Sequence, residues 1–202
     1  MRQIAMMGLA ALLAFAGAAQ AEHPPGPPPP PAVIKALQQG GLVLYLRHAS
    51  TEKKADADSV NFDDCATQRN LDDQGRYAAK AIGDGMVRLR IPVAEVLSSP
   101  FCRTRDTALI AFGRARIDVV LTSRGKPDAP EEQARLPEIR RLLSTRPPAG
   151  NLMLVGHSPA MDRLAQIHVD EGEMAVFKPL GDGKFDFLGR IRAEHWARLR
   201  VR

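Results

Sequence analysis

Residues 42–50 read LVLYLRHAS, in which five apolar side chains are followed directly by an arginine and a histidine. A short, bulky apolar run of this kind is typical of a strand that is buried on both faces of a sheet. The residues after such a strand lie at the edge of the sheet. The stretch therefore predicts a buried strand that delivers Arg47 and His48 together to one sheet edge.

Strand and helix patterns alternate outward from this stretch. Apolar residues at three- and four-residue steps predict helices at 32–39, 72–90, 103–112, 130–144, 161–167 and 194–201. Short apolar runs predict strands at 42–46, 93–97, 117–121, 152–155, 174–177 and 185–191. The polar segment 51–70 is expected to be a long loop, and loops of this length are usually functional. The alternation predicts an α/β fold with a mostly parallel central sheet covered by helices on both faces.

The first 31 residues are expected to lie outside that domain. Arg2, the apolar stretch 4–19 and the small residues before position 22 predict a secretory signal peptide over residues 1–21, cleaved after Ala21. An uncleaved membrane anchor is the alternative, but its apolar run is short for a bilayer span. Residues 22–31, EHPPGPPPPP, predict an extended Pro-rich spacer. Residues 32–202 then form one periplasmic or secreted domain, without stable membrane insertion after cleavage.

Charge and cysteine content further restrict the class of protein that the chain can be. The chain has 28 Lys and Arg against 23 Asp and Glu, a formal net charge of +5. Because the two signs are nearly balanced, the composition does not indicate nucleic-acid binding. The two cysteines, Cys65 and Cys102, predict a disulfide if the chain is exported, and two buried thiols are the alternative. Two cysteines alone cannot form a closed zinc site.

Three predicted strands end in residues that suit an anion site. Arg47 and His48 follow the first, Arg103 follows the second, and His157 follows the fourth. In an open parallel sheet, ligands bind beyond the carboxyl ends of the strands, so these side chains are expected to converge. Guanidinium groups match phosphate oxygens, and Ser158 opens a helix whose first N–H groups face the same edge. The pattern predicts a site for a dianionic tetrahedral group.

The sequence resembles a known family in the same three places. LRHA at 46–49 resembles the Arg-His-Gly/Ala signature of the histidine phosphatase superfamily, which has the phosphoglycerate mutase-like three-layer fold. SPFCRT at 99–104, with Thr-Ala at 107–108, is similar to the family's second motif, and VGHSP at 155–159 resembles its second-histidine motif. Order and spacing agree over about residues 40–200, and the leader suggests a small exported branch.

The resemblance implies a mechanism and roles for particular residues. His48 would be the nucleophile that forms a phosphohistidine, which water then hydrolyses. Arg47, Arg103 and His157 would hold the phosphoryl oxygens, where charge accumulates in the transition state. Neither a metal nor a cofactor is expected, because guanidinium groups supply the positive charge. Arg69 lies in a segment that resembles a further family motif, and it could reach the substrate or merely pair with neighbouring aspartates.

The proton donor to the leaving group is less well defined. One branch of the family has a glutamate in a Leu-x-Glu context, and Leu-Pro-Glu at 136–138 resembles it, which makes Glu138 the predicted acid. The alternative is a solvated glutamate near the start of a helix. Asp63 and Asp64 in the long loop are further candidates.

These features together predict an exported phosphatase that acts on a small phosphorylated molecule. Alternatives are a phosphohistidine phosphatase, a lipopolysaccharide-sugar phosphatase, a mutase and a non-catalytic phosphate-binding module. The export signal disfavours a glycolytic mutase, and retention of His48 disfavours the binding module. The residue pattern leaves the physiological substrate and the oligomeric state open.

Overall fold

The computed structural model describes residues 29–123 and 129–200. The predicted signal peptide, residues 1–21, and most of the predicted spacer, residues 22–31, lie outside the described residues and stay predictions. Within the described part of the chain, no helix is both long enough and apolar enough to cross a membrane.

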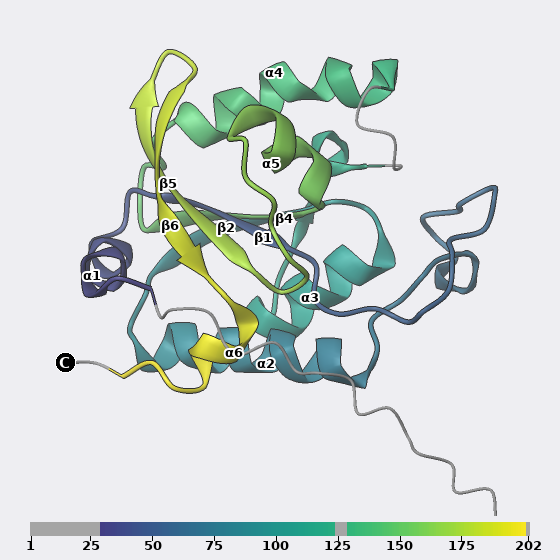
Figure 1. The fold of residues 1–202 in the computed structure, drawn as a ribbon, viewed down its shortest axis with the longest axis horizontal. Helices are drawn as coiled ribbons and strands as arrows, with labels where there is room; N and C mark the ends of the chain where they lie inside the picture. The colour runs from purple at the N-terminus through teal and green to yellow at the C-terminus, as the bar shows by residue number, and fades with distance from the viewer. Residues whose placement is uncertain (1–28, 124–128, 201–202) are drawn as a thin grey trace, which may run out of the picture.

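One six-stranded sheet forms the centre of the molecule, with the strand order β3-β2-β4-β1-β5-β6 (Figure 1). The strands are β1 (Val43–Arg47), β2 (Val93–Ser98), β3 (Arg116–Ile117), β4 (Asn151–Gly156), β5 (Met174–Gly181) and β6 (Lys184–Ile191). Strands β1 to β4 pair in parallel, whereas β5 and β6 pair antiparallel with their neighbours. The predicted α/β fold is confirmed, as a mixed sheet with a parallel half and an antiparallel hairpin.

Helices cover both faces of this sheet (Figure 1). They are α1 (Pro31–Gln39), α2 (Asp73–Arg88), α3 (Cys102–Phe112), α4 (Pro130–Ser144), α5 (Ser158–Leu164) and α6 (Ala193–Trp196), with short 3₁₀ turns η1 (Cys65–Thr67) and η2 (Val119–Leu121). Helices α1, α2, α3 and α6 pack on one face, and α4 and α5 pack on the other. The three-layer arrangement expected from the sequence is therefore present.

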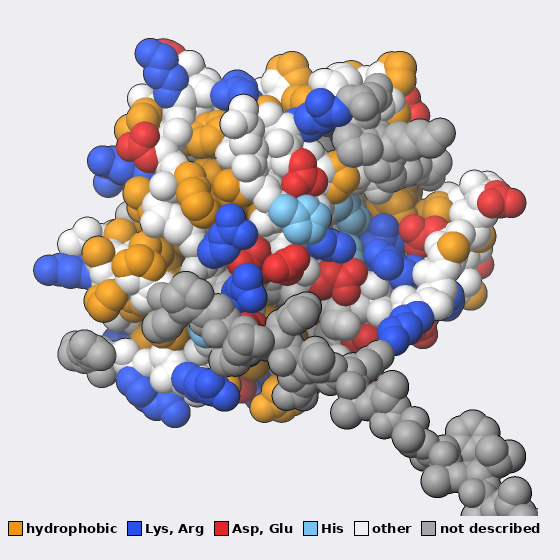
Figure 2. Space-filling view, viewed as in Figure 1, with side chains coloured by type: hydrophobic (Ala, Val, Ile, Leu, Met, Phe, Trp, Pro, Cys, Tyr) orange, Lys and Arg blue, Asp and Glu red, His pale blue; other side chains and the backbone are white. Residues whose placement is uncertain are grey.

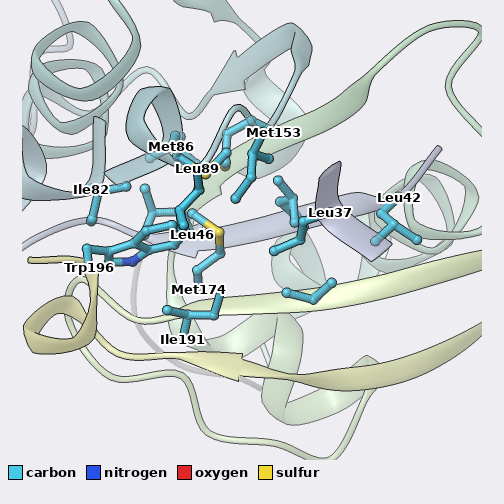
Figure 3. Packing of buried hydrophobic residues seen from close by; sticks show 14 of the residues in the cluster. Leu37, Leu42, Leu46, Ile82, Met86, Leu89, Met153, Met174, Ile191 and Trp196 are labelled. Atoms are coloured by element: carbon cyan, nitrogen blue, oxygen red, sulfur yellow. The ribbon is translucent and has the colours of Figure 1, made fainter. Parts of the chain in front are cut away.

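Strand β1 shows why the opening apolar run has no polar interruptions. Leu44 and Leu46 point into the core under α2 and α6, and Val43 and Tyr45 point into the core under α4 and α5. All four side chains are at most 1% exposed. Figure 3 shows Leu46 packed with side chains from α2, β4, β5, β6 and α6. A central strand that is buried on both faces needs apolar residues at every position.

Two predicted elements are much shorter in the structure than expected. The strand expected at 117–121 ends at Ile117, because the carboxylate of Asp118 accepts a hydrogen bond from the Val120 N–H and turns the chain into η2. The helix expected at 194–201 ends at Trp196. The Arg88 guanidinium donates to the carbonyls of Trp196 and Leu199, which removes acceptors that a longer helix would use.

Candidate active site

The ends of the parallel strands bring the predicted residues to one edge of the sheet. Arg47, the last residue of β1, pairs with Gly156, the last residue of β4. The His48 N–H then donates to the Gly156 carbonyl at 3.1 Å, and the Ser99 N–H donates to the Val155 carbonyl at 3.0 Å. The three chain segments therefore leave the sheet side by side.

A cavity of about 340 Å³ opens at this edge. Figure 2 shows histidine side chains in the middle of one face, surrounded by acidic and basic side chains. Six predicted site residues line the cavity: Arg47, His48, Arg69, Arg103, His157 and Ser158. The other lining residues are Asp56, Ala57, Asp58, Val60, Phe101, Ser123 and Pro159. The convergence predicted from the strand ends is thus present in the structure.

His48 has the environment of a neutral nucleophile. Its side chain is 2% exposed, and its Nδ1 lies 2.9 Å from the carbonyl oxygen of Ala49. A carbonyl can only accept a hydrogen bond, so Nδ1 carries the ring proton and Nε2 keeps its lone pair. Burial lowers the pKa of His48 well below its usual value, and the nearby Arg103 and Arg47 lower it further. The imidazole is therefore unprotonated at neutral pH, with Nε2 available for attack.

This environment predicts the acid side of the pH profile. An unperturbed histidine titrates near pH 6.5, and protonation of Nε2 would block attack on phosphorus. Because the pKa of His48 lies below that value, kcat/KM is expected to remain high as the pH falls through 6.5, and to decline only at lower pH. A profile of kcat/KM against pH measures this limb in the free enzyme. An acid limb centred at or above pH 6.5 would contradict the assignment.

His157 lies close to His48, and hydrogen bonds hold both its ring and its backbone. The two imidazole ring centroids are 5.4 Å apart. His157 Nε2 lies 3.0 Å from the Ser99 hydroxyl, which leaves Nδ1 for a ligand. Burial lowers the pKa of His157 well below its usual value, and repulsion from His48 and Arg103 lowers it further. A neutral His157 can therefore donate one ring proton to a phosphoryl oxygen without adding charge to the site.

The Tyr45 hydroxyl fixes the backbone of His157. It donates to the His157 carbonyl at 2.8 Å and accepts from the His157 N–H at 3.1 Å. This hydroxyl occupies the space beside Gly156, where an added Cβ would lie 2.3 Å from it. A glycine before His157 is therefore required by close approach of Tyr45, and the family-like Gly-His pair has a packing explanation.

Replacing Gly156 with alanine is expected to destabilise the fold by about 1–3 kcal/mol and to reduce kcat, because the clash with the Tyr45 hydroxyl moves His157. Chemical denaturation and steady-state kinetics measure the two effects. In a Tyr45→Phe background the same replacement should cost less stability, since the closest clashing atom is gone. Equal costs in both backgrounds would show that Tyr45 does not impose the glycine.

Three arginines and two carboxylates surround the histidines. Arg47 donates to the Val169 carbonyl at 3.1 Å and lies 3.3 Å from Glu171, while Arg69 lies 3.7 Å from the same carboxylate. Arg103 Nη1 lies 3.0 Å from Asp56. Each of these guanidinium groups is therefore paired with a carboxylate.

Arg103 has an unsatisfied donor within this arrangement. The residue is 4% exposed, and its Nε has no hydrogen-bond partner among the described residues. A buried N–H without an acceptor is unfavourable, and an oxygen of a bound anion would satisfy it. Since Arg103 lines the cavity beside His48 and His157, the donor set suits a phosphate better than an uncharged ligand.

The long loop that follows β1 forms one wall of the cavity. A disulfide joins Cys65 in this loop to Cys102 at the start of α3, which confirms the pairing predicted from the sequence. Gln68 accepts a hydrogen bond from the Cys102 N–H at 2.8 Å, and Arg105 donates to the Phe62 carbonyl at 3.1 Å. These contacts hold the loop against the helix that carries Arg103.

Ser158 begins α5 and lines the cavity, as predicted, but its hydroxyl is engaged elsewhere. It lies 3.2 Å from Asp162 and 3.1 Å from His168 Nδ1, and it accepts from the Val169 N–H at 3.4 Å. The side chain therefore ties α5 to the segment before β5. What Ser158 can offer an anion is its backbone N–H at the start of the helix.

The structure does not bring Glu138 to the site. Glu138 lies on α4, pairs with Arg141 at 2.5 Å and has a side chain that is 46% exposed. It is not among the residues that line the cavity, and a helix-surface ion pair accounts for it. The alternative, a solvated glutamate, agrees with the structure, although Glu138 lies in the middle of α4 and not near its start. The other candidates, Asp63 and Asp64, also lie outside the cavity lining, and Asp64 caps η1.

Several site residues were not identified from the sequence. Asp56 and Asp58 line the cavity, Glu171 pairs with Arg47, and Tyr45 and Ser99 position His157. The two aspartates belong to an acidic, irregular loop in which no residue pattern distinguishes one carboxylate from another. Tyr45 looked like one more apolar position in a buried strand. Ser99 lies within the SPFCRT motif at 99–104, and that motif is the signal in the sequence that could have identified it.

A family model described as the histidine phosphatase superfamily (branch 1) matches residues 43–126. That range contains β1, the cavity-lining loop, β2 and α3. No curated protein matches the sequence.

Solved structures share the fold. A complex of the protein histidine phosphatase SixA with tungstate superposes with a TM-score of 0.58 at 17% identity, covering 76% of this chain and 98% of that one. YhfR from Bacillus stearothermophilus gives 0.56 at 16% identity, covering 72% and 94%. A mycobacterial glucosyl-3-phosphoglycerate phosphatase gives 0.50 at 17% identity, covering 73% and 97%. At these identities the likeness establishes a common fold.

Proposed function

We propose that this chain is a member of the histidine phosphatase superfamily, whose model matches residues 43–126, and that it hydrolyses a small phosphomonoester through a phosphohistidine on His48, without a metal and after export. The observation that carries the proposal is the state of His48. A buried, neutral imidazole with Nδ1–H held by the Ala49 carbonyl presents the Nε2 lone pair to a cavity lined by three arginines.

The proposed first step is attack of His48 Nε2 on phosphorus. Arg47, Arg69 and Arg103 offset the charge of the phosphoryl oxygens, and His157 donates to one of them. The P–N bond forms as the bond from phosphorus to the leaving oxygen breaks. The ring of the phosphohistidine is then cationic, and the Ala49 carbonyl stabilises its Nδ1–H. Water attacks phosphorus in the second step and regenerates the neutral imidazole.

The size of the cavity supports a small substrate. Its volume of about 340 Å³ lies at the lower end of the range for small-molecule sites. The named structural neighbours include both a protein histidine phosphatase and a glucosyl-3-phosphoglycerate phosphatase, so the shared fold is compatible with either class. A phosphohistidine phosphatase, supported by the likeness to SixA, is the second candidate. A lipopolysaccharide-sugar phosphatase would be one form of the small-substrate proposal.

Export rests on the N-terminal sequence and on the disulfide. Residues 1–21 have the charge, apolar run and cleavage residues of a signal peptide. The Cys65–Cys102 bond is of a kind that forms in oxidising compartments. N-terminal sequencing of the protein recovered from the periplasmic fraction should begin at Glu22. Recovery of an intact Met1 terminus from membranes would favour the uncleaved anchor instead.

The catalytic proposal is tested with the mature protein and para-nitrophenyl phosphate in excess chelator. Turnover is expected to be unchanged by the chelator and to be inhibited by vanadate. Loss of turnover that returns with an added divalent cation would overturn metal independence. A screen of phosphosugars, nucleotides, phytate and a phosphohistidine peptide then separates the substrate classes. The highest kcat/KM on the phosphopeptide would favour the second candidate.

A further inference from the structure

We infer that Asp56 is the proton donor to the leaving group in the first step and the base toward water in the second. This inference rests on the proposed phosphohistidine mechanism and assigns the acid that the sequence misplaced at Glu138. Among the described residues, Asp56 and Asp58 are the carboxylates that line the cavity. The two differ in how they are held.

Asp56 is fixed to the phosphate-binding machinery. Its Oδ1 lies 3.0 Å from Arg103 Nη1 and accepts the Arg69 N–H at 2.7 Å. Both contacts use the same oxygen, which leaves Oδ2 to carry a proton. The side chain is 29% exposed, so solvent can reach it and supply a proton when the substrate binds. Asp58, by contrast, is exposed, and among the described residues no ion pair joins it to an arginine.

The formal charges of the site leave room for one further proton once the substrate is bound. Arg47, Arg69 and Arg103 carry three positive charges, and Asp56 and Glu171 carry two negative charges. His48 and His157 stay neutral because burial lowers the pKa of each. A bound phosphate dianion therefore turns a net charge of +1 into −1, and Asp58 at the rim makes it more negative. Uptake of one proton by Asp56 removes that excess next to the dianion.

The proton then follows the phosphoryl group through both steps. As His48 Nε2 bonds to phosphorus, the P–O bond breaks and its electron pair takes the proton from Asp56. The alcohol leaves, and Asp56 becomes a carboxylate. In the second step water attacks phosphorus, Asp56 takes a proton from that water, and the P–N bond breaks to release phosphate. The imidazole and the protonated Asp56 are restored, so each turnover consumes one water.

Other groups near the cavity are less suited to this role. The Ser158 hydroxyl already contacts Asp162 and His168. Glu171 lies between Arg47 and Arg69 and is not part of the cavity lining. Asp56 is the carboxylate that both lines the cavity and contacts a phosphate-binding arginine.

The dependence on the leaving group tests the inference. Protonation matters little for an acidic leaving group such as para-nitrophenol and much for an alcohol. Asp56→Asn keeps the shape and the Oδ1 acceptor but removes the proton. It is expected to lower the phosphorylation rate with glycerol 2-phosphate by about 10²–10⁴-fold, and to change that with para-nitrophenyl phosphate far less. Asp58→Asn is the matched control and should keep the wild-type ratio between the two substrates.

Proton uptake on binding is a second measurement, and it would not change in Asp56→Asn if Asp56 had only a structural role. Tungstate binding, followed by calorimetry in two buffers of different ionisation enthalpy, should take up about one proton in the wild type and none in Asp56→Asn. A similar rate loss on both substrates, or unchanged proton uptake, would show that Asp56 only positions Arg103. If Asp58→Asn instead changed the ratio of the rates with the two substrates, Asp58 would be the acid and the inference would be wrong.

The inference and the proposed function fail in different ways. If the wild type forms no phosphohistidine, the proposed function itself is wrong. If the wild type forms it and Asp56→Asn retains the wild-type leaving-group dependence, the mechanism stands and only the assignment of Asp56 is lost.

Discussion

Replacing His48 with alanine is expected to lower kcat for para-nitrophenyl phosphate by roughly 10⁴- to 10⁶-fold, the scale on which loss of a catalytic nucleophile acts. The reason is that no other nucleophile occupies its place. The other cavity imidazole, His157, contacts the Ser99 hydroxyl through Nε2. The arginines can bind a phosphate, but they cannot form the covalent intermediate that divides the reaction into two steps.

The measurement pairs steady-state kinetics with trapping of the intermediate. Wild-type protein that is quenched during turnover of labelled substrate should carry an acid-labile, alkali-stable phosphoryl group, as expected for a P–N bond. The His48→Ala variant should carry none, yet should still bind tungstate because Arg47, Arg69 and Arg103 remain. Equal turnover by the two proteins would eliminate the enzyme mechanism and leave the non-catalytic phosphate-binding module as the explanation of the site.

Removal of the Cys65–Cys102 disulfide by double replacement with serine is expected to destabilise the protein by about 3–4 kcal/mol in the chain-entropy model. The bond closes a loop with a sequence separation of 37 residues. The segment 51–70, which carries Cys65, has no buried apolar side chain, so hydrophobic packing compensates little for loss of the bond. Guanidinium unfolding of the oxidised wild type and of the double variant measures the difference.

With para-nitrophenyl phosphate, whose acidic leaving group needs little help from Asp56, the same replacement should also raise KM more than it lowers kcat. Asp56, Ala57, Asp58, Val60 and Arg69 all line the cavity from the segment that the disulfide ties to α3. A looser segment weakens substrate binding, while His48 and His157 stay on strand ends outside it. Reduction of the wild type provides the matched control and should reproduce both effects. Two titratable thiols per chain in denatured, non-reduced wild type would show that the bond is not formed.

The sequence was informative where one physical requirement controls a residue. The buried run of β1 can only be apolar, and its ending in Arg47-His48 predicts where the site lies. The N-terminus of α4 at Pro130 and its end at Ser144 agreed with the prediction, because proline at a helix start and a break before paired prolines are local signals. The disulfide followed from the export signal and an even cysteine count.

The sequence was less informative where residues from several distant segments could occupy the same position in the site. Glu138 satisfied a local pattern but lies on the outer side of α4 with Arg141. Asp56 satisfied no pattern, and its loop is held beside Arg103 by the disulfide and by hydrogen bonds that join Gln68 to Cys102 and Phe62 to Arg105. Motif spacing describes a chain, whereas a proton donor is defined by where a carboxyl group lies in space.

The amino-acid sequence by itself thus determined the layer architecture, the strand that carries the candidate nucleophile, and the four strand-end residues Arg47, His48, Arg103 and His157. Burial and strand geometry act through neighbouring residues, so their signature can be read along the chain. Tertiary structure alone decided which carboxylates face the phosphate site, how Tyr45 fixes His157, and that Nδ1 of His48 holds the proton. Those outcomes depend on distances between groups that are remote in sequence, and no local preference encodes such a distance.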